Sequence, residues 1–215
     1  MTNPFNPGYL NEHDLKDAGF KSLGRNVQIS KNCTVIGLEN IEIGDNVRID
    51  GYCSIFASRE GWVKLGSFIH IGSYCLLSAG SGIQMDDFSG LSQGVKLYSR
   101  TDDYSGKHLT NPMVPDVYTG VTCGPVVLEK HAIVGAGSVI LPKVTIGEGS
   151  SVGALSLVTK NLDPWGVFFG APAKKLKNRS KQLLTLESAL RRELGQQLGH
   201  QQLGQTVKPE FSLSE

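Results

Sequence analysis

Aliphatic side chains recur at every sixth position along most of this 215-residue chain. The recurring positions form six groups of three, and all are apolar: Leu23, Ile29 and Val35; Ile43, Ile49 and Ile55; Leu65, Ile71 and Leu77; Met85, Leu91 and Leu97; Leu128, Val134 and Ile140; Ile146, Val152 and Val158. A helix repeats its buried face every three or four residues and a strand every two, so neither explains this spacing. The period predicts a repeat architecture.

A second column of small or β-branched residues stands two positions before the first column. Cys33, Cys53 and Cys75 occupy the same place in three successive groups, and no two cysteines form a CxxC pair. A buried thiol behaves as a small hydrophobic group. We therefore interpret these cysteines as reduced packing residues rather than metal ligands.

Three periods per group predict a coil with three short sides. Many of the aliphatic positions are followed by glycine, which we expect to accommodate the corners. Stacked coils pair edge to edge through backbone hydrogen bonds. The sequence thus predicts an all-β fold, a parallel β-helix of triangular section with about six coils.

The register breaks outline the domains. A loop over residues 98–127 separates Leu97 from Leu128, and long loops in compact domains are usually functional. We expect an N-terminal cap over residues 1–22, the β-helix over 23–178, and a C-terminal helix and tail over 179–215. Leucines at helical spacing favour a helix near 180–194, packed on the tube or on a partner chain, followed by a frayed Gln/Gly-rich tail.

Composition excludes several classes of partner. The chain has 21 Lys+Arg against 20 Asp+Glu, a net charge of +1, so no broad field attracts nucleic acid or an anionic membrane. No apolar run reaches membrane-spanning length, and the N-terminus has no basic region followed by an apolar stretch. We therefore expect a cytoplasmic protein without nucleic-acid or membrane partners.

Two segments carry a family resemblance. Leu65-Gly-Ser-Phe-Ile-His70 and Ile146-Gly-Glu-Gly-Ser-Ser151 resemble the repeats of the hexapeptide-repeat acyltransferases. Residues 152–160 and 164–175 are similar to the coenzyme A end of that family. The resemblance implies a left-handed parallel β-helix, an acyl-CoA donor and a homotrimer with active sites between subunits.

The loop narrows the resemblance further. Tyr98-Ser-Arg-Thr-Asp-Asp-Tyr-Ser-Gly106, together with residues 86–92, resembles the subgroup that N-acylates nucleotide-linked amino sugars such as dTDP-linked 3- or 4-amino-dideoxyhexoses. The resemblance implies transfer of an acetyl or other short acyl group from acyl-CoA to a sugar amine. It also implies a role in biosynthesis of surface polysaccharide, such as the O-antigen of lipopolysaccharide.

Acyl transfer to an amine needs a group that binds and orients the ammonium form and takes or relays its proton. Asp102 and Asp103 in the loop fit this role. Neighbouring residues on an extended segment point in opposite directions, so we expect one of them to face the amine, and we favour Asp102. His70 is the second catalytic candidate, expected near a corner and pointing out of the tube.

Both substrates have candidate binding residues. For the sugar nucleotide they are Ser92, Tyr104, His108 and Asn111. For coenzyme A the resemblance implies Ala136, Ala154, Thr159, Lys160, Lys174 and Lys177. The alanines let pantetheine approach the backbone, and the lysines belong to a basic cluster suited to phosphates.

Three rival functions differ in what they require. An O-acetyltransferase of this family uses a loop histidine to deprotonate a hydroxyl, and Asp102 or Asp103 stands there instead. A γ-type carbonic anhydrase needs closely spaced zinc-binding histidines, whereas His108 and His131, the nearest candidates, are far apart, so we expect no metal. A non-catalytic scaffold needs neither the long loop nor the coenzyme A-like end.

Overall fold

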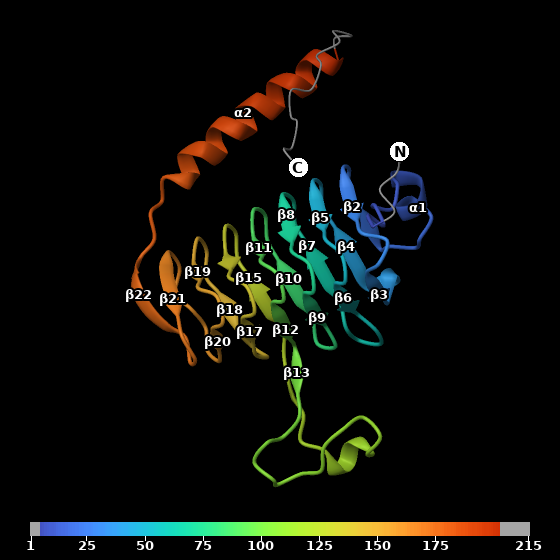
Figure 1. Cartoon of the computed structure of the whole chain (residues 1–215), viewed down its shortest axis with the longest axis vertical. Helices are drawn as coiled ribbons and strands as arrows, with labels where there is room; N and C mark the ends of the chain where they lie inside the picture. Colours follow the sequence, from blue (N-terminus) through green and yellow to red (C-terminus); the bar gives the residue numbers. More distant parts are fainter. Residues whose placement is uncertain (1–4, 203–215) are drawn as a thin grey trace. The chain divides into compact units, whose positions relative to one another are not determined.

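The six-residue period folds into three parallel sheets, because each period supplies one short strand and the strands of successive coils pair in register. The computed structural model describes residues 5–202, and Figure 1 shows the strands stacked coil upon coil. We call the sheets the first, second and third face. The first face contains β1 (Ser22–Leu23), β4 (Ile41–Ile43), β7 (Val63–Leu65), β10 (Ile83–Met85), β15 (Val126–Leu128) and β18 (Thr145–Ile146).

The other two faces continue each coil. The second face contains β2 (Val27–Ile29), β5 (Val47–Ile49), β8 (Ile69–Ile71), β11 (Gly90–Leu91), β16 (Ile133–Val134), β19 (Ser151–Val152), β21 (Gly166–Phe169) and β22 (Lys174–Asn178). The third face contains β3 (Thr34–Ile36), β6 (Ser54–Phe56), β9 (Leu76–Ser78), β12 (Lys96–Tyr98), β17 (Val139–Ile140) and β20 (Leu157–Val158). The predicted parallel β-helix is confirmed.

The core consists of the predicted inward columns. Every aliphatic position of the period is buried except Leu23 and Val35 in the first coil, which are half-buried. The short helix α1 (Glu12–Lys16) lies before the first coil, with Asn11 capping its N-terminus. Its Leu15 is 1% exposed and belongs to the same core cluster. The N-terminal segment therefore closes the interior at that end.

The tube has about seven turns rather than six. Leu162 bridges Ile146 of β18, and β21 pairs with β19 so that Phe168 stands opposite Val152. The strand β22 then runs back antiparallel to β21. The sequence prediction missed this turn because its residues leave the six-residue register after Val158.

The corners differ from the prediction. At the first corner, between the first and second faces, the residue three positions before the inward aliphatic adopts a positive φ in every coil, and only one of these residues is glycine: Asn26, Asn46, Phe68, Phe88, His131, Gly149 and Trp165. Three of these residues stack on one another along the corner. The ring centroids of Phe68 and Phe88 are 4.7 Å apart, and those of Phe88 and His131 are 5.2 Å apart.

The glycines that follow the aliphatic positions serve a different purpose from the one predicted. A Cβ at Gly44 would lie 2.6 Å from the carbonyl oxygen of Gly66, and one at Gly135 would lie 2.5 Å from the amide nitrogen of Ala154. These distances are shorter than van der Waals contact. Glycine is therefore needed because neighbouring coils approach closely there, and not because the backbone turns.

The cysteine column is structural, as predicted. The thiols of Cys33, Cys53 and Cys75 donate to the carbonyl oxygens of Asp50, Gly72 and Ser92 at 3.1, 3.1 and 3.2 Å. A hydrogen bond with Cys53, together with burial, raises the pKa of the Cys33 thiol. A protonated thiol is a poor nucleophile and a poor metal ligand. A hydrogen bond with Cys53 instead lowers the pKa of Cys75, so the structural role of Cys75 rests on its burial and its hydrogen bond to Ser92.

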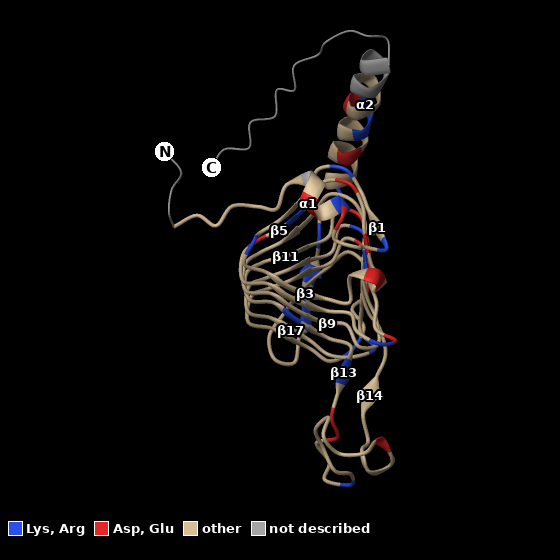
Figure 2. Cartoon of the chain, turned by 90° about the vertical axis from the view of Figure 1, so that its right-hand side faces the viewer, with Lys and Arg blue, Asp and Glu red and all other residues tan. Residues whose placement is uncertain are grey.

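The third corner, between the third and first faces, carries the insertions. The long loop leaves the tube here through the antiparallel ribbon of β13 (Arg100–Thr101) and β14 (Thr122–Cys123). Beyond the ribbon, Leu109 bridges Thr119, next to the 3₁₀ turn Asp116–Tyr118. Figure 2 shows the ribbon extending from the tube, with acidic segments in the loop beyond it.

The chain divides into two compact units, Met1–Arg179 and Ser180–Glu215. The second contains α2 (Leu183–Gln202), which continues past the predicted end near residue 194. Its glycines cost about 1 kcal/mol each relative to alanine, and this helix tolerates them. The predicted Gln/Gly-rich tail beyond residue 202 lies outside the described residues. Within residues 5–202, no helix has the length and apolarity needed to span a membrane.

Because the coils approach so closely, adding one methyl group at a glycine between them should lower the stability of the tube. Gly44→Ala should destabilise the tube by about 1–3 kcal/mol, because the added Cβ meets the backbone of Gly66. Thermal unfolding followed by circular dichroism measures this effect. The same substitution at Gly195, where an added Cβ meets no atom within 4 Å, is the control and should leave unfolding of the tube unchanged. A Gly44→Ala protein as stable as the parent would contradict this packing account.

Candidate active site

A cavity at the base of the loop contains the first catalytic candidate. Its volume is about 320 Å³, and its walls come from the ribbon, the loop and one corner insertion: Arg59, Arg100, Thr101, Asp102, Asn111, Pro112, Asp116, Thr119 and Val121. The amide N–H of Asn111 donates to Oδ2 of Asp102 at 3.4 Å. This long contact leaves Asp102 able to accept a hydrogen bond from a molecule in the cavity.

The adjacent Asp103 has a different environment. Its carboxylate accepts hydrogen bonds from the amide of Ser105 at 2.8 Å, the hydroxyl of Ser105 at 3.0 Å and the amide of His108 at 3.1 Å. Nδ1 of His108 lies 3.0 Å from Oδ2. The Ser105 and His108 hydrogen bonds hold the pKa of the Asp103 carboxyl well below its usual range. Asp103 therefore organises the loop and is a poor proton acceptor.

The predicted sugar-nucleotide residues do not lie together. Asn111 lines the same cavity as Asp102, and its side chain accepts a hydrogen bond from the amide of Met113 at 3.0 Å. His108 is held by Asp103, and Tyr104 is 91% exposed. Ser92 follows β11 at the second corner, between the second and third faces, so β12 separates it from the loop. A single chain thus presents Ser92 and Asp102 at two different corners.

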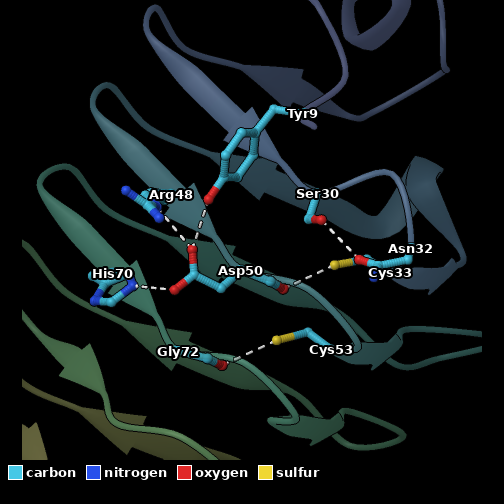
Figure 3. A network of polar contacts seen from close by, with 9 residues as sticks. All are labelled: Tyr9, Ser30, Asn32, Cys33, Arg48, Asp50, Cys53, His70 and Gly72. Carbon is cyan, nitrogen blue, oxygen red and sulfur yellow. Dashed lines mark hydrogen bonds and ion pairs between the residues drawn. The ribbon is translucent and has the colours of Figure 1, made fainter. Parts of the chain in front are cut away.

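The second catalytic candidate, His70, lies in a short strand that ends at the second corner. His70 is the central residue of β8 between the buried Ile69 and Ile71, so its side chain points outward, as predicted. Its Nε2 lies 2.8 Å from Oδ2 of Asp50 (Figure 3). The inward Ile71 ends the strand, so the second corner begins two residues after His70.

Asp50 organises a polar network around His70. Oδ1 of Asp50 accepts hydrogen bonds from Nε of Arg48 at 2.7 Å and from the hydroxyl of Tyr9 at 2.9 Å. Burial favours the neutral carboxyl, but hydrogen bonds from His70, Arg48 and Tyr9 outweigh it and lower the pKa of Asp50. The sequence analysis missed Tyr9, Arg48 and Asp50. The six-residue register contained a signal for Arg48, because Arg48 and His70 both directly precede an inward isoleucine.

Four of the predicted coenzyme A residues follow one face of the last coils. Ala136 and Ala154 stand at the second corner in successive coils, and the amide of Leu155 donates to the carbonyl oxygen of Ala136 at 2.8 Å. Thr159 and Lys160 follow β20, at the other end of the third face. The two pairs therefore flank the third face.

The basic residues lie on the edge strand β22. Lys174 pairs with Phe169 and Lys177 with Val167, which brings Lys174 to the end of the second face near the Ala154 corner. Arg179, just after β22, donates to the carbonyl oxygens of His131 and Gly149, each at 2.9 Å. These hydrogen bonds hold the end of β22 against the first corner. Among the described residues, no group of three or more His, Cys, Asp or Glu side chains is arranged to hold a metal ion.

Comparisons with known proteins identify relatives of this chain. Residues 125–160 match the family model described as bacterial transferase hexapeptide (six repeats). The dTDP-4-amino-4,6-dideoxy-D-glucose acyltransferase of Escherichia coli is 42% identical over 183 residues, which cover 85% of this chain and 95% of that enzyme.

Solved structures show the same relationship. AntD, an N-acyltransferase from Bacillus cereus solved with dTDP and 3-hydroxybutyryl-CoA, is 39% identical, with a TM-score of 0.84 over 89% of this chain and all of that one. A maltose O-acetyltransferase from Clostridium difficile is 22% identical, with a TM-score of 0.53 over 79% of this chain and 75% of that one, and shares the fold alone. The chain belongs to the hexapeptide-repeat acyltransferase family, in the branch of acyl-CoA-dependent N-acyltransferases for nucleotide-linked amino sugars.

Proposed function

We propose that this chain transfers a short acyl group from acyl-CoA to the amine of a dTDP-linked 4-amino-4,6-dideoxy sugar. One observation carries the proposal. The solved forms of AntD include variants at a serine and at an aspartate ten positions further along, in complexes with coenzyme A and dTDP or the dTDP-linked amino sugar. In this chain Asp102 is the only aspartate with a serine ten positions before it, and that serine is Ser92.

The chemistry assigns a role to each of these residues. The carboxylate of Asp102 accepts a hydrogen bond from the sugar ammonium, orients it and takes a proton. The hydroxyl of Ser92 hydrogen-bonds to the amine. The neutral amine attacks the thioester carbonyl, and the C–N bond forms as the C–S bond breaks. The new amide nitrogen loses a proton to the departing coenzyme A thiolate, and Asp102 releases to solvent the proton that it took from the ammonium.

Binding of the donor relies on the last coils. Glycine and alanine at the Ala136 and Ala154 corner let pantetheine reach backbone groups. Lys160, Lys174 and Lys177, with Thr159, surround the end of the tube, where the phosphates of coenzyme A meet positive charge. This arrangement directs the thioester toward Ser92, which lies one coil before Ala136.

The proposal requires a homotrimer. Ser92 and Asp102 of one chain stand at different corners, so a complete site forms when the loop of one subunit reaches the second corner of its neighbour. Closed three-fold symmetry makes three equal sites of this kind. We place the reaction in the cytoplasm, in the synthesis of a surface polysaccharide such as the O-antigen of lipopolysaccharide.

A thiol-release assay tests the reaction. With acetyl-CoA or 3-hydroxybutyryl-CoA, the purified chain should release coenzyme A thiol in the presence of dTDP-4-amino-4,6-dideoxyglucose and form an amide. The matched acceptor with a hydroxyl at the same carbon should give no product, because a carboxylate is too weak a base to activate an alcohol. Ester formation on the hydroxyl sugar, with no turnover of the amine, would establish an O-acetyltransferase instead.

Substitutions at the two neighbouring aspartates should have different effects on activity. Asp102→Asn should lower kcat/KM for the amino sugar by at least about tenfold, because the amide side chain cannot take a proton from the sugar ammonium. Asp103→Asn should leave kcat within about threefold and instead loosen the loop, since Asp103 accepts the loop's own hydrogen bonds. Steady-state kinetics and limited proteolysis of the loop measure the two effects. Full activity of the Asp102→Asn enzyme would contradict its assigned role.

A further inference from the structure

The glycine at position 94 of the second corner is not required by the conformation of the backbone. In the second to sixth coils the same position of this corner has a positive φ, between +57° and +70°, and it is filled in turn by Tyr52, Tyr74, Gly94, Gly137 and Leu155. Two tyrosines and a leucine adopt this conformation, so the corner tolerates a side chain. The positive φ therefore does not account for the two glycines.

The two glycines differ in what surrounds them. A Cβ at Gly137 would lie 2.8 Å from Cδ2 of Leu155, so the leucine side chain of the next coil already covers that position. A Cβ at Gly94 would meet nothing closer than Cα and N of Gly137, each at 3.9 Å, which is ordinary van der Waals contact. An alanine would therefore fit at position 94, and Gly94 leaves open a place that a side chain could fill.

The backbone amides of both glycines are already used. The amide of Gly94 donates to the carbonyl oxygen of Ser73 at 2.9 Å, and the amide of Gly137 donates to the carbonyl oxygen of Gln93 at 2.9 Å. Glycine can serve to let a ligand approach a backbone donor, but these two donors are occupied by the neighbouring coils. Gly94 thus provides space rather than a hydrogen-bond donor.

The walls of this space are apolar. On its N-terminal side the ring of Tyr74 stacks on Tyr52, with centroids 5.0 Å apart and planes 6° apart, and Tyr74 remains 63% exposed. On its C-terminal side Leu155 covers Gly137 and is 78% exposed. Neighbouring coils are about 4.8 Å apart, so one missing side chain leaves room for a single alkyl chain. We call this space the Gly94 slot.

The Gly94 slot lies beside the proposed reaction centre. Ser92 precedes Gly94 by two residues, so their Cα atoms are at most about 7 Å apart. Ala136 directly precedes Gly137, so a thioester that follows the Ala136 corner to Ser92 has its acyl chain within reach of the slot. We propose that the Gly94 slot receives the acyl chain of the donor and that Gly94 sets the longest chain transferred. This inference rests on the proposed function and adds the residue that selects the acyl group.

The chemistry of the walls favours the acyl chain over the sugar. An amino sugar carries an ammonium and hydroxyls, which would lose hydrogen bonds to water against Leu155 and the face of Tyr74. An alkyl chain instead gains free energy when it leaves water at the same place. One methyl group in an apolar pocket changes kcat/KM by about tenfold or more, so a single alanine at Gly94 is a measurable test.

The test compares acyl donors of increasing length with one acceptor, dTDP-4-amino-4,6-dideoxyglucose, in the thiol-release assay. Gly94→Ala should lower kcat/KM for butyryl-CoA by at least about tenfold relative to acetyl-CoA, because the added methyl group fills part of the slot. Leu155→Ala should shift the preference the other way and raise kcat/KM for hexanoyl-CoA relative to acetyl-CoA by about tenfold. Partial unfolding cannot produce both of these opposite shifts.

A matched glycine serves as the control. Gly19 also has a positive φ, +95°, and an added Cβ there meets no atom within 4 Å. Gly19→Ala adds the same methyl group at a positive φ outside the slot, and it should leave the ratio of butyryl to acetyl transfer unchanged.

Binding without an acceptor gives a second readout that does not depend on turnover. Isothermal titration calorimetry compares butyryl-CoA with coenzyme A, which lacks the acyl chain. The parent should bind butyryl-CoA more tightly than coenzyme A. Gly94→Ala should weaken binding of butyryl-CoA by about tenfold and leave binding of coenzyme A unchanged.

The outcomes separate this inference from the proposed function. If Gly94→Ala keeps the parental ratio of butyryl to acetyl transfer, or only raises KM for the amino sugar, Gly94 does not select the acyl chain, even when the enzyme acylates the amine. If the parent binds butyryl-CoA no more tightly than coenzyme A, the slot is likewise overturned. If Gly94→Ala loses butyryl-CoA binding alone but no amine is acylated by the parent, the slot stands and the proposed reaction is wrong.

Discussion

Edge-to-edge stacking of the coils is the constraint on which the rest of this structure depends. On all three faces each strand hydrogen-bonds to the strands of the coils next to it, so a coil cannot shift without breaking backbone bonds on three sides. The close approach excludes a Cβ at Gly44 and Gly135. Aliphatic side chains fill the inward positions, so the interior has little room for polar or reactive groups. Function is left to the corners, the outer faces and the inserted loop.

The candidate site follows from that division. The loop leaves at the third corner and places Asp102 in a cavity at its base, while Ser92 and the glycines around it stay at the second corner. A rigid tube cannot bend to bring its own corners together. In the proposed homotrimer, the third corner of one tube is placed against the second corner of the next.

The sequence predicted most of the fold because the six-residue period is a direct consequence of the stacked coils. The seventh turn was missed, because the step from Val158 to Leu162 is four residues and the six-residue register resumes only between Leu162 and Phe168. The corner conformations were also missed. A positive φ at Phe68 or Trp165 is offset by the surrounding structure, and residue identity alone does not reveal it.

The site was less accessible to prediction. Asp102 and Asp103 are adjacent and chemically identical, and only the hydrogen bonds from Ser105 and His108 distinguish them. Asp50 and Tyr9 are 41 positions apart, and nothing local in the sequence indicates that they meet. The pairing of Arg48 with His70 could have been predicted from the sequence, because both residues occupy the same outward position of the repeat in successive coils.

The central claim is that each reaction centre is built from two copies of this chain. Co-expression of a Ser92→Ala chain with an Asp102→Asn chain, purification of the mixed oligomer and a thiol-release assay test it most directly. If one subunit supplies Ser92 and its neighbour supplies Asp102, random mixing in a cyclic trimer leaves about a quarter of the centres intact, and activity should return to roughly that fraction. Mixed oligomers that remain as inactive as the two parent variants would show that both residues act within a single chain.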